Sequence, residues 1–220
     1  AKYNIFISGG TGSGKTTFLI ALSNYIPKDE RVITIEDSAE LQIKGVANLV
    51  RMETRNANME GKGEVTIRDL IRSSLRMRPE RFVVGEVRGA EALDMLQAMN
   101  TGHDGSLSTG HSNSTKDMLS RLETMVISGN NIPIDAIRQQ IASAIDIIIQ
   151  LSRLRDKSRR TLEITEVVDY VDGKFILNPL YKFAEHGEDK NGRIIGGLER
   201  TENPMKNTYK FHMAGLSDKV

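Results

Sequence analysis

Up to Ile145, short apolar runs alternate with segments in which apolar positions recur every three or four residues, a pattern that predicts alternating strands and helices. Short apolar runs predict strands, and apolar positions recurring every three or four residues predict helices. The predicted strands are Tyr3–Ser8, Arg31–Glu36, Leu49–Thr54, Phe82–Glu86 and Ser106–Thr109. The predicted helices are Lys15–Tyr25, Thr66–Met77, Ala90–Asn100, Ser114–Ser128 and Pro133–Ile145. This alternation is typical of an α/β fold with a mostly parallel sheet flanked by helices.

The pattern changes after Ile145, where strands dominate. The β-branched run Ile145–Leu151 predicts one more strand. The basic stretch Arg153–Arg160 is interpreted as a solvated hairpin loop rather than a contact for nucleic acid or acidic lipid. Two alternating segments, Leu162–Tyr170 and Phe175–Tyr181, are joined by Asp172-Gly173. They predict a β-hairpin added to the C-terminal side of the sheet.

The rest of the chain gives weaker signals. Glu185–Gly197 is rich in glycine and charge, and is predicted to be a flexible surface loop. The last stretch is a weak helix candidate. The sequence is therefore divided into a domain over residues 1–183 and a flexible loop and tail over residues 184–220.

Composition narrows the class of protein. With 220 residues, 30 Lys plus Arg against 29 Asp plus Glu, and 39% hydrophobic residues, the chain suits one large soluble α/β domain. The charge is balanced, tryptophan is absent and aromatic residues make up 5%, so the composition does not indicate direct binding to nucleic acid. The absence of cysteine excludes disulfides and thiolate chemistry and fits a cytosolic protein.

The segment Gly9–Thr16 reads GGTGSGKT and lies between a predicted strand and a predicted helix. This is the context required of a phosphate-binding loop, in which glycines let successive backbone N–H groups point at phosphate oxygens. Lys15 is placed to contact the β- and γ-phosphates, and the Thr16 hydroxyl to ligate Mg²⁺. The residues predicted to bind nucleotide are Gly10, Thr11, Gly12, Ser13, Gly14, Lys15, Thr16 and Thr17.

Two acids end predicted strands, at the edge where parallel sheets bind ligands. Glu86 is the last residue of the predicted strand Phe82–Glu86, and it is predicted to contribute to the coordination shell of Mg²⁺ or to contact the attacking water. Glu36 closes Arg31–Glu36 and can act as general base or position a water, unless it is an exposed loop acid. Which of the two is the base stays open.

Histidines and arginines complete the candidate set. His103 and His111 flank the strand Ser106–Thr109, where they could sense a γ-phosphate. Arg51 and Arg55 leave the third strand and could supply charge for a phosphoryl transition state, as arginines from a neighbouring subunit do in ring ATPases. No N-K-x-D segment of a GTPase and no LSGGQ-like segment of a transporter ATPase is present.

Taken in this order, the phosphate loop, IEDSAEL with Glu36, VVGE with Glu86, and TGHDGSLSTGH resemble the type II/type IV secretion ATPase superfamily. The stretch RMRPERFVVGEVRGAEALDMLQAMNTGHDGSLSTGH is most similar to its CpaF/TadA-like pilus-assembly branch. The resemblance covers residues 4 to 181. It implies a RecA-like P-loop NTPase domain that hydrolyses ATP with Mg²⁺. It also implies a homohexamer, cytoplasmic and peripheral to the inner membrane, which powers a secretion or pilus complex.

The resemblance also assigns roles. Lys15 and Thr16 would hold phosphate and Mg²⁺, while Glu36 and Glu86 would divide water activation and metal coordination. His103 and His111 fall in the family's histidine box.

Arg51 and Arg55 match a segment where family arginines approach the nucleotide. The family's N-terminal domain, which helps to close over the nucleotide, is expected to be missing from this chain. Two other hypotheses remain: a nucleotide-binding assembly module inactive in isolation, and a small-molecule phosphotransferase.

Overall fold

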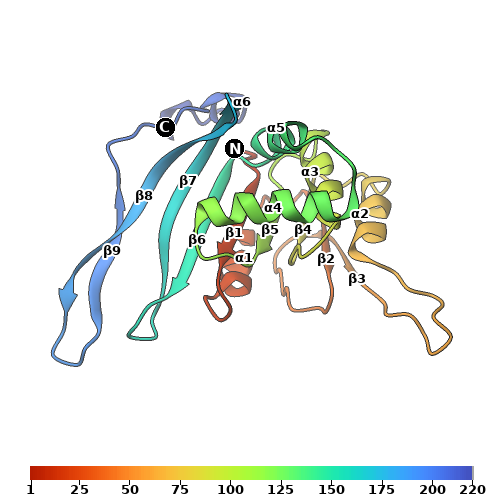
Figure 1. Cartoon of the computed structure of the whole chain (residues 1–220), viewed down its shortest axis with the longest axis horizontal. Helices are drawn as coiled ribbons and strands as arrows, with labels where there is room; N and C mark the ends of the chain where they lie inside the picture. The colour runs from red at the N-terminus through yellow and green to blue at the C-terminus, as the bar shows by residue number, and fades with distance from the viewer. Residues whose placement is uncertain (220) are drawn as a thin grey trace.

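The computed structural model describes residues 1–219, which form one nine-stranded sheet flanked by helices (Figure 1). The strands are β1 (Ile5–Gly9), β2 (Arg31–Glu36), β3 (Asn48–Glu53), β4 (Arg81–Val84), β5 (Leu107–Gly110), β6 (Ile147–Arg153), β7 (Arg159–Val171), β8 (Lys174–Glu188) and β9 (Ile194–Arg200). The helices are α1 (Lys15–Ser23), α2 (Ile67–Leu75), α3 (Glu91–Asn100), α4 (Thr115–Gly129), α5 (Ile134–Ala144) and α6 (Tyr209–Met213), followed by the short 3₁₀ turn η1 (Ser217–Lys219). The predicted α/β fold is confirmed.

The strand order places the start of the chain in the middle of the sheet. The order is β3-β2-β4-β5-β1-β6-β7-β8-β9, and the strands from β3 to β6 are parallel. Ile5 of β1 pairs with Leu107 on one side and with Ile147 on the other. The carboxyl ends of β1, β2, β4 and β5 therefore meet at one edge of the sheet, where ligands bind in open parallel sheets.

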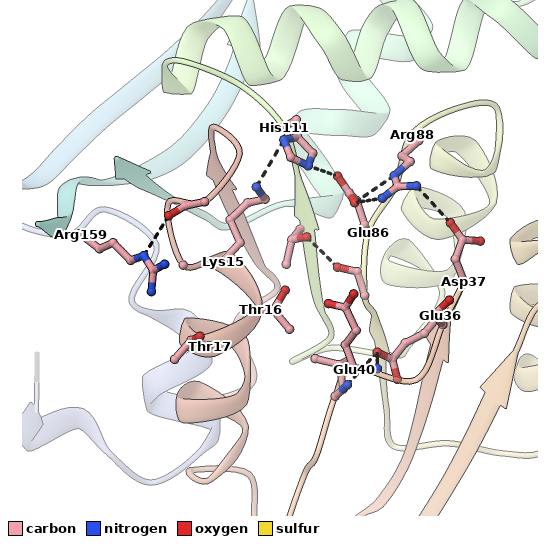
Figure 2. Close-up of a pocket in the computed structure, with 16 residues that line it drawn as sticks. Lys15, Thr16, Thr17, Glu36, Asp37, Glu40, Glu86, Arg88, His111 and Arg159 are labelled. Atoms are coloured by element: carbon pink, nitrogen blue, oxygen red, sulfur yellow. Dashed lines mark hydrogen bonds and ion pairs between the residues drawn. The ribbon is translucent and has the colours of Figure 1, made fainter. Parts of the chain in front are cut away.

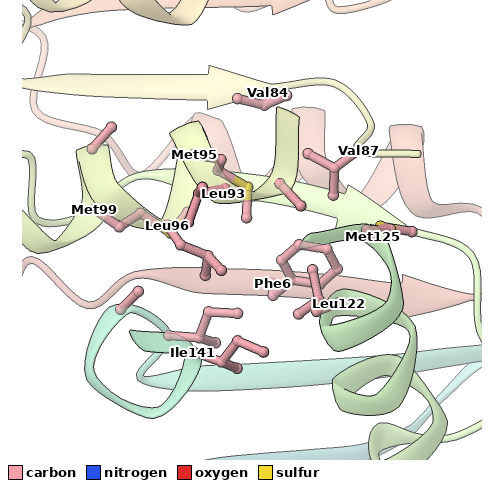
Figure 3. Close-up of a cluster of buried hydrophobic side chains, with 14 of the residues drawn as sticks. Phe6, Val84, Val87, Leu93, Met95, Leu96, Met99, Leu122, Met125 and Ile141 are labelled. Atoms are coloured by element: carbon pink, nitrogen blue, oxygen red, sulfur yellow. The ribbon is translucent and has the colours of Figure 1, made fainter. Parts of the chain in front are cut away.

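Two apolar cores cover the two faces of the sheet. The larger packs α2, α3, α4 and α5 against one face, around Phe6, Met95, Leu96 and Leu122 (Figure 3). The smaller packs α1 through Leu19 against the other face. Both faces are apolar because a parallel strand with helices on each side has no solvent-facing side. This packing fixes the strand ends that form the site.

Side chains cap two helices where the sequence predicts helix starts. Thr66 accepts a hydrogen bond from the backbone N–H of Asp69, whose carboxylate accepts one from the backbone N–H of Thr66. Ser114 caps α4 by accepting from the backbone N–H of Asp117. Within residues 1–219, no helix combines the length and apolar composition needed to cross a bilayer.

The C-terminal part of the sheet is antiparallel and larger than the predicted hairpin. β6, β7, β8 and β9 pair in succession, and Asp172 and Gly173 form the β7–β8 turn with φ of 51° and 77°. The prediction of a loop over Glu185–Gly197 is wrong, because this segment holds the end of β8, a short turn and the start of β9. Ladder hydrogen bonds, which side-chain pattern does not reveal, satisfy its backbone.

The residues after β9 return to the amino-terminal edge of the sheet. Lys210 of α6 donates to Asp104 at 2.7 Å and to Asp146 at 2.6 Å. The ring of Phe211 packs on Tyr3 at 5.2 Å between centroids. The predicted C-terminal helix is thus confirmed as the short α6, and it lies at the edge opposite the candidate site.

Candidate functional site

The phosphate loop, Gly9–Thr16, connects β1 to α1 and has the backbone that its glycines allow. Gly12 and Gly14 have φ of 73° and 95°, the left-handed region that other residues avoid. A Cβ at Gly9 would lie 2.7 Å from the carbonyl oxygen of Leu151, so the loop lies directly against β6. The loop therefore presents backbone N–H groups and the N-terminus of α1 to one cavity, an arrangement that binds anions.

Lys15 is folded back onto this loop. Its Nζ donates to the carbonyl oxygens of Gly9 and Gly10 at 2.9 and 3.1 Å and lies 3.5 Å from Nδ1 of His111. Burial lowers the pKa of the Lys15 amine, against the nearby carboxylate of Glu86, which raises it. An anion at the loop would therefore restore the favourable surroundings of a buried ammonium.

Glu86, which follows β4, lies on the opposite wall of the cavity (Figure 2). Its Oε2 accepts from Nε and Nη2 of Arg88 at 2.9 and 2.6 Å, and Arg88 also lies 3.5 Å from Asp37. Its Oε1 lies 2.7 Å from Nε2 of His111 without making a hydrogen bond. Burial, followed by the Lys15 ammonium, lowers the pKa of His111, which favours a neutral imidazole.

Glu36, the last residue of β2, is buried at the floor of the cavity. Its Oε1 accepts from the backbone N–H groups of Leu41 and Glu40 at 2.8 and 3.0 Å. Burial raises the pKa of Glu36 although these two hydrogen bonds lower it. A raised carboxyl pKa is what a general base requires. Gly85 leaves room for this side chain, since a Cβ there would lie 3.0 Å from Cγ of Glu36.

These side chains line one cavity of about 420 Å³, a size typical of small-molecule sites. Thr109 of β5 links two sides of the cavity, because its Oγ1 donates a hydrogen bond to the carbonyl oxygen of Gly85, which follows β4, at 2.6 Å. The cavity is lined by Gly12, Gly14, Lys15, Thr16, Thr17, Glu36, Asp37, Glu40, Glu86, Arg88, His111 and Arg159, among others. Most predicted nucleotide-binding residues and both predicted acids thus face the same space.

The donor set of this cavity fits a Mg²⁺ ion carried by phosphates. Oε1 of Glu86, on one wall, is buried without a hydrogen-bond partner in the described part of the chain. Thr16 adds a hydroxyl from the facing wall, which the phosphate loop forms. No group of three or more His, Cys, Asp or Glu gathers as a metal cage within residues 1–219. Mg²⁺ is commonly held in this way, by one or two protein oxygens together with substrate phosphates and waters.

Three of the residues with a predicted catalytic role are not brought to this cavity. His103 lies before β5, at the opposite edge of the sheet, where its Nδ1 is 3.2 Å from Ala98 O and its ring packs near Phe82. Arg51 is on the edge strand β3, with Nη2 3.4 Å from the carbonyl oxygen of Ile43. Arg55 donates to the carbonyl oxygen of Gly63 and lines a separate surface hollow. Within one chain, none of the three contacts the cavity.

Two arginines of the cavity were not predicted. Arg88 lies two residues after Glu86, and this spacing alone is sufficient to suggest that the two side chains pair. Arg159 comes from the basic stretch interpreted as a solvated loop. Its Nε donates to the carbonyl oxygen of Gly12 at 2.9 Å. No local signal distinguishes it from the other arginines of that stretch, because the contact spans 147 residues of sequence.

Comparisons with known proteins identify relatives of this chain. The family model described as "Type II/IV secretion system protein" matches residues 1–194. A putative conjugal transfer protein of Mycobacterium tuberculosis is 44% identical over 164 residues, which are 74% of this chain and 46% of that protein. The type IV secretion system protein PtlH of Bordetella pertussis is 38% identical over 77% of this chain and 50% of its own length.

A solved structure gives the same relationship. The VirB11 ATPase from the Brucella suis type IV secretion system, in complex with sulphate, aligns with a TM-score of 0.68 and 34% identity over 74% of this chain and 49% of that one. The RecA-like fold expected from the sequence is thereby confirmed. The chain spans about half the length of the relatives it matches.

Proposed function

The chain belongs to the type II/IV secretion system protein family, and on that premise we propose that it binds ATP with Mg²⁺ and hydrolyses it. The observation that carries this proposal is the convergence of three groups on one cavity. Lys15 and the phosphate loop form one wall, Glu86 and His111 the opposite wall, and the buried acid Glu36 the floor. Anion binding, cation binding and a base of raised pKa are the three requirements of a phosphoryl-transfer site.

Each side chain has a task that its surroundings support. The loop N–H groups and Lys15 bind the phosphates. The Thr16 hydroxyl and Glu86 would hold Mg²⁺, which when bound neutralises phosphate charge and aids departure of the leaving group. Glu36, held by two backbone N–H groups, orients the attacking water and accepts its proton. His111 lies between Lys15 and Glu86 and is placed to respond to the γ-phosphate.

The finer identity is also part of the proposal. We propose a homohexameric ring of the CpaF/TadA-like pilus-assembly branch, cytoplasmic and peripheral to the inner membrane, that powers a pilus or type II/IV secretion complex. Residues 1–183 would be its ATPase domain. Support for a role in secretion comes from relatives whose names place them in conjugal transfer and type IV secretion.

A second candidate is a module that binds ATP but turns it over negligibly in isolation. It is favoured by the contacts of the two main charged groups. Lys15 bonds its own loop, and Arg88 holds Glu86. Both must be released before they can serve a nucleotide.

The rate of ATP hydrolysis per chain, measured against protein concentration, separates the two candidates. For a ring-forming ATPase we expect the rate to rise with concentration. Glu36→Gln, which removes the proposed base, should lower it at least about a hundredfold with ATP affinity retained, and Lys15→Ala should abolish nucleotide binding. No hydrolysis at any concentration, with intact ATP binding, would favour the inactive module. Steady phosphorylation of an added small molecule would contradict both.

A further inference from the structure

Arg159 stands beside the phosphate loop, although it comes from the distant strand β7. Besides the bond from its Nε to the carbonyl oxygen of Gly12, its Cδ would lie 3.3 Å from a Cβ added at Gly14. The aliphatic part of the arginine therefore packs on the loop where no side chain intervenes. Figure 2 shows the guanidinium on the Thr17 side of the cavity, away from Glu86 and Arg88.

Arg159 differs in its partners from the other two cations of the cavity. Arg88 is paired with Glu86 and Asp37, and Lys15 lies near Glu86. No carboxylate of the described residues forms an ion pair with Arg159, although the opposite wall carries several acids. An arginine fork without an acidic partner, beside a row of backbone N–H groups, is suited to a phosphate.

The turn before Arg159 is fixed from the far end of the sheet. Asp156 accepts hydrogen bonds from N and Oγ of Ser158 and, through Oδ2, from the backbone N–H of Ile194 at 2.9 Å. These bonds lower the pKa of Asp156 to about 2, the Ser158 hydroxyl having the largest effect. Arg155 pairs with Glu185 of β8. The β8–β9 hairpin thus holds the β6–β7 turn against the loop.

We propose that Arg159 binds the nucleotide's polyphosphate through its guanidinium, at the end of the loop away from Glu86, and that the β8–β9 hairpin positions it through Asp156. This inference rests on the proposed nucleotide binding and adds a residue from outside the four motifs. Since the contact lies away from the γ-phosphate groups Glu86 and His111, it contributes equally to ADP and ATP.

Equilibrium titration with a fluorescent ADP analogue, displaced by ADP, ATP and pyrophosphate, tests the contact. Arg159→Ala is expected to weaken all three about tenfold, as the loss of a charged hydrogen bond does. Arg160→Ala, the neighbouring exposed arginine on the other face of β7, should change them less than about twofold. Arg159→Gln keeps an N–H donor for Gly12 without the charge, and is expected to bind as weakly as Arg159→Ala.

Each other outcome points to a different failure. If the wild type binds no nucleotide, the proposed function fails. If the wild type binds and Arg159→Ala matches Arg160→Ala, only this inference fails. Wild-type affinity in Arg159→Gln would show that the arginine only stabilises the conformation of the loop. Unchanged pyrophosphate affinity in Arg159→Ala would show that Arg159 contacts the nucleoside and not the phosphates. Both results overturn the inference.

The hairpin's part is tested by a double-mutant cycle. Asp156→Ala is expected to weaken ADP binding a few-fold in the wild-type background and to have no effect in Arg159→Ala, because both act through the same guanidinium. Equal losses in the two backgrounds would show that Asp156 does not act through Arg159.

Discussion

Replacing Gly85 by alanine is expected to slow ATP hydrolysis about tenfold while nucleotide affinity and the fold are nearly unchanged. Gly85 directly precedes Glu86, and an added Cβ would lie 3.0 Å from Cγ of Glu36. The next nearest atoms, Ile35 O at 3.6 Å and Glu36 Cβ at 3.7 Å, are at ordinary contact distance. The substitution therefore acts on one side chain.

The magnitude follows from these distances. Carbon atoms pack at about 3.5 Å or more, so the Glu36 side chain must move by a few tenths of an ångström. Its Oε1 resists the movement because Leu41 and Glu40 donate to it. A misplacement of about 1 Å costs about a hundredfold in rate, and a fraction of that costs about tenfold. Overpacking of about 1 kcal/mol is largely offset by the reduced freedom of the unfolded chain.

The assay compares turnover at saturating ATP, and ADP affinity, for the wild type, Gly85→Ala and Gly197→Ala. Gly197 is the matched control, because a Cβ there meets nothing within 4 Å. Turnover of Gly85→Ala within twofold of the wild type would refute the reasoning, since the position of Glu36 would then not limit hydrolysis. A loss of ADP affinity beyond about threefold would show that the substitution distorts the loop instead.

Three further predictions concern charge. Burial raises the pKa of Glu36, so the wild type loses stability as pH rises from the pKa of Glu36 in the unfolded chain through its pKa in the folded protein. The thermal stability of Glu36→Gln should therefore increase relative to that of the wild type from pH 4 to pH 7, and a constant difference would contradict this. Glu30 and Arg81 form a buried ion pair, so Arg81→Met, which leaves Glu30 unpaired, should lower the free energy of unfolding in urea by about 3 kcal/mol. The double variant Glu30→Leu/Arg81→Met should lower it by less than about 1 kcal/mol, and equal losses in the two variants would argue against the pair. Burial and Lys15 lower the pKa of His111 and the Arg88 charge lowers it further, so Arg88→Ala should raise it in an NMR titration, and a fall would reverse the assigned sign.

The sequence predicts the centre of the site because that centre is local. A strand, a glycine loop and a helix in succession place Lys15, and parallel strands bring the residues after their carboxyl ends to one edge. That rule alone gathers Glu36, Glu86 and His111 around the phosphate loop.

The same rule explains why His103 does not join His111 at the cavity. β5 has 4 residues and spans roughly 13 Å, so residues before and after it lie at opposite edges. Arg159 and β9 could not be predicted for another reason. Their positions depend on partners far along the chain, the carbonyl oxygen of Gly12 and the ladder of β8. Gly196 reads as a loop residue, yet a Cβ there would lie 2.4 Å from the carbonyl oxygen of Ala184, so the closeness of two strands requires the glycine.

The central position of β1 has a consequence for how the protein is made. The phosphate loop precedes β5 and β6 in the sequence, yet within residues 1–219 these are the strands with which β1 pairs, through partners such as Leu107 and Ile147. Contacts so distant in sequence close late and slowly during folding. The loop is therefore synthesised before β5 and β6 and takes its final shape only after these strands have paired with β1. Nucleotide binding by a newly made chain would thus report that the parallel sheet is complete.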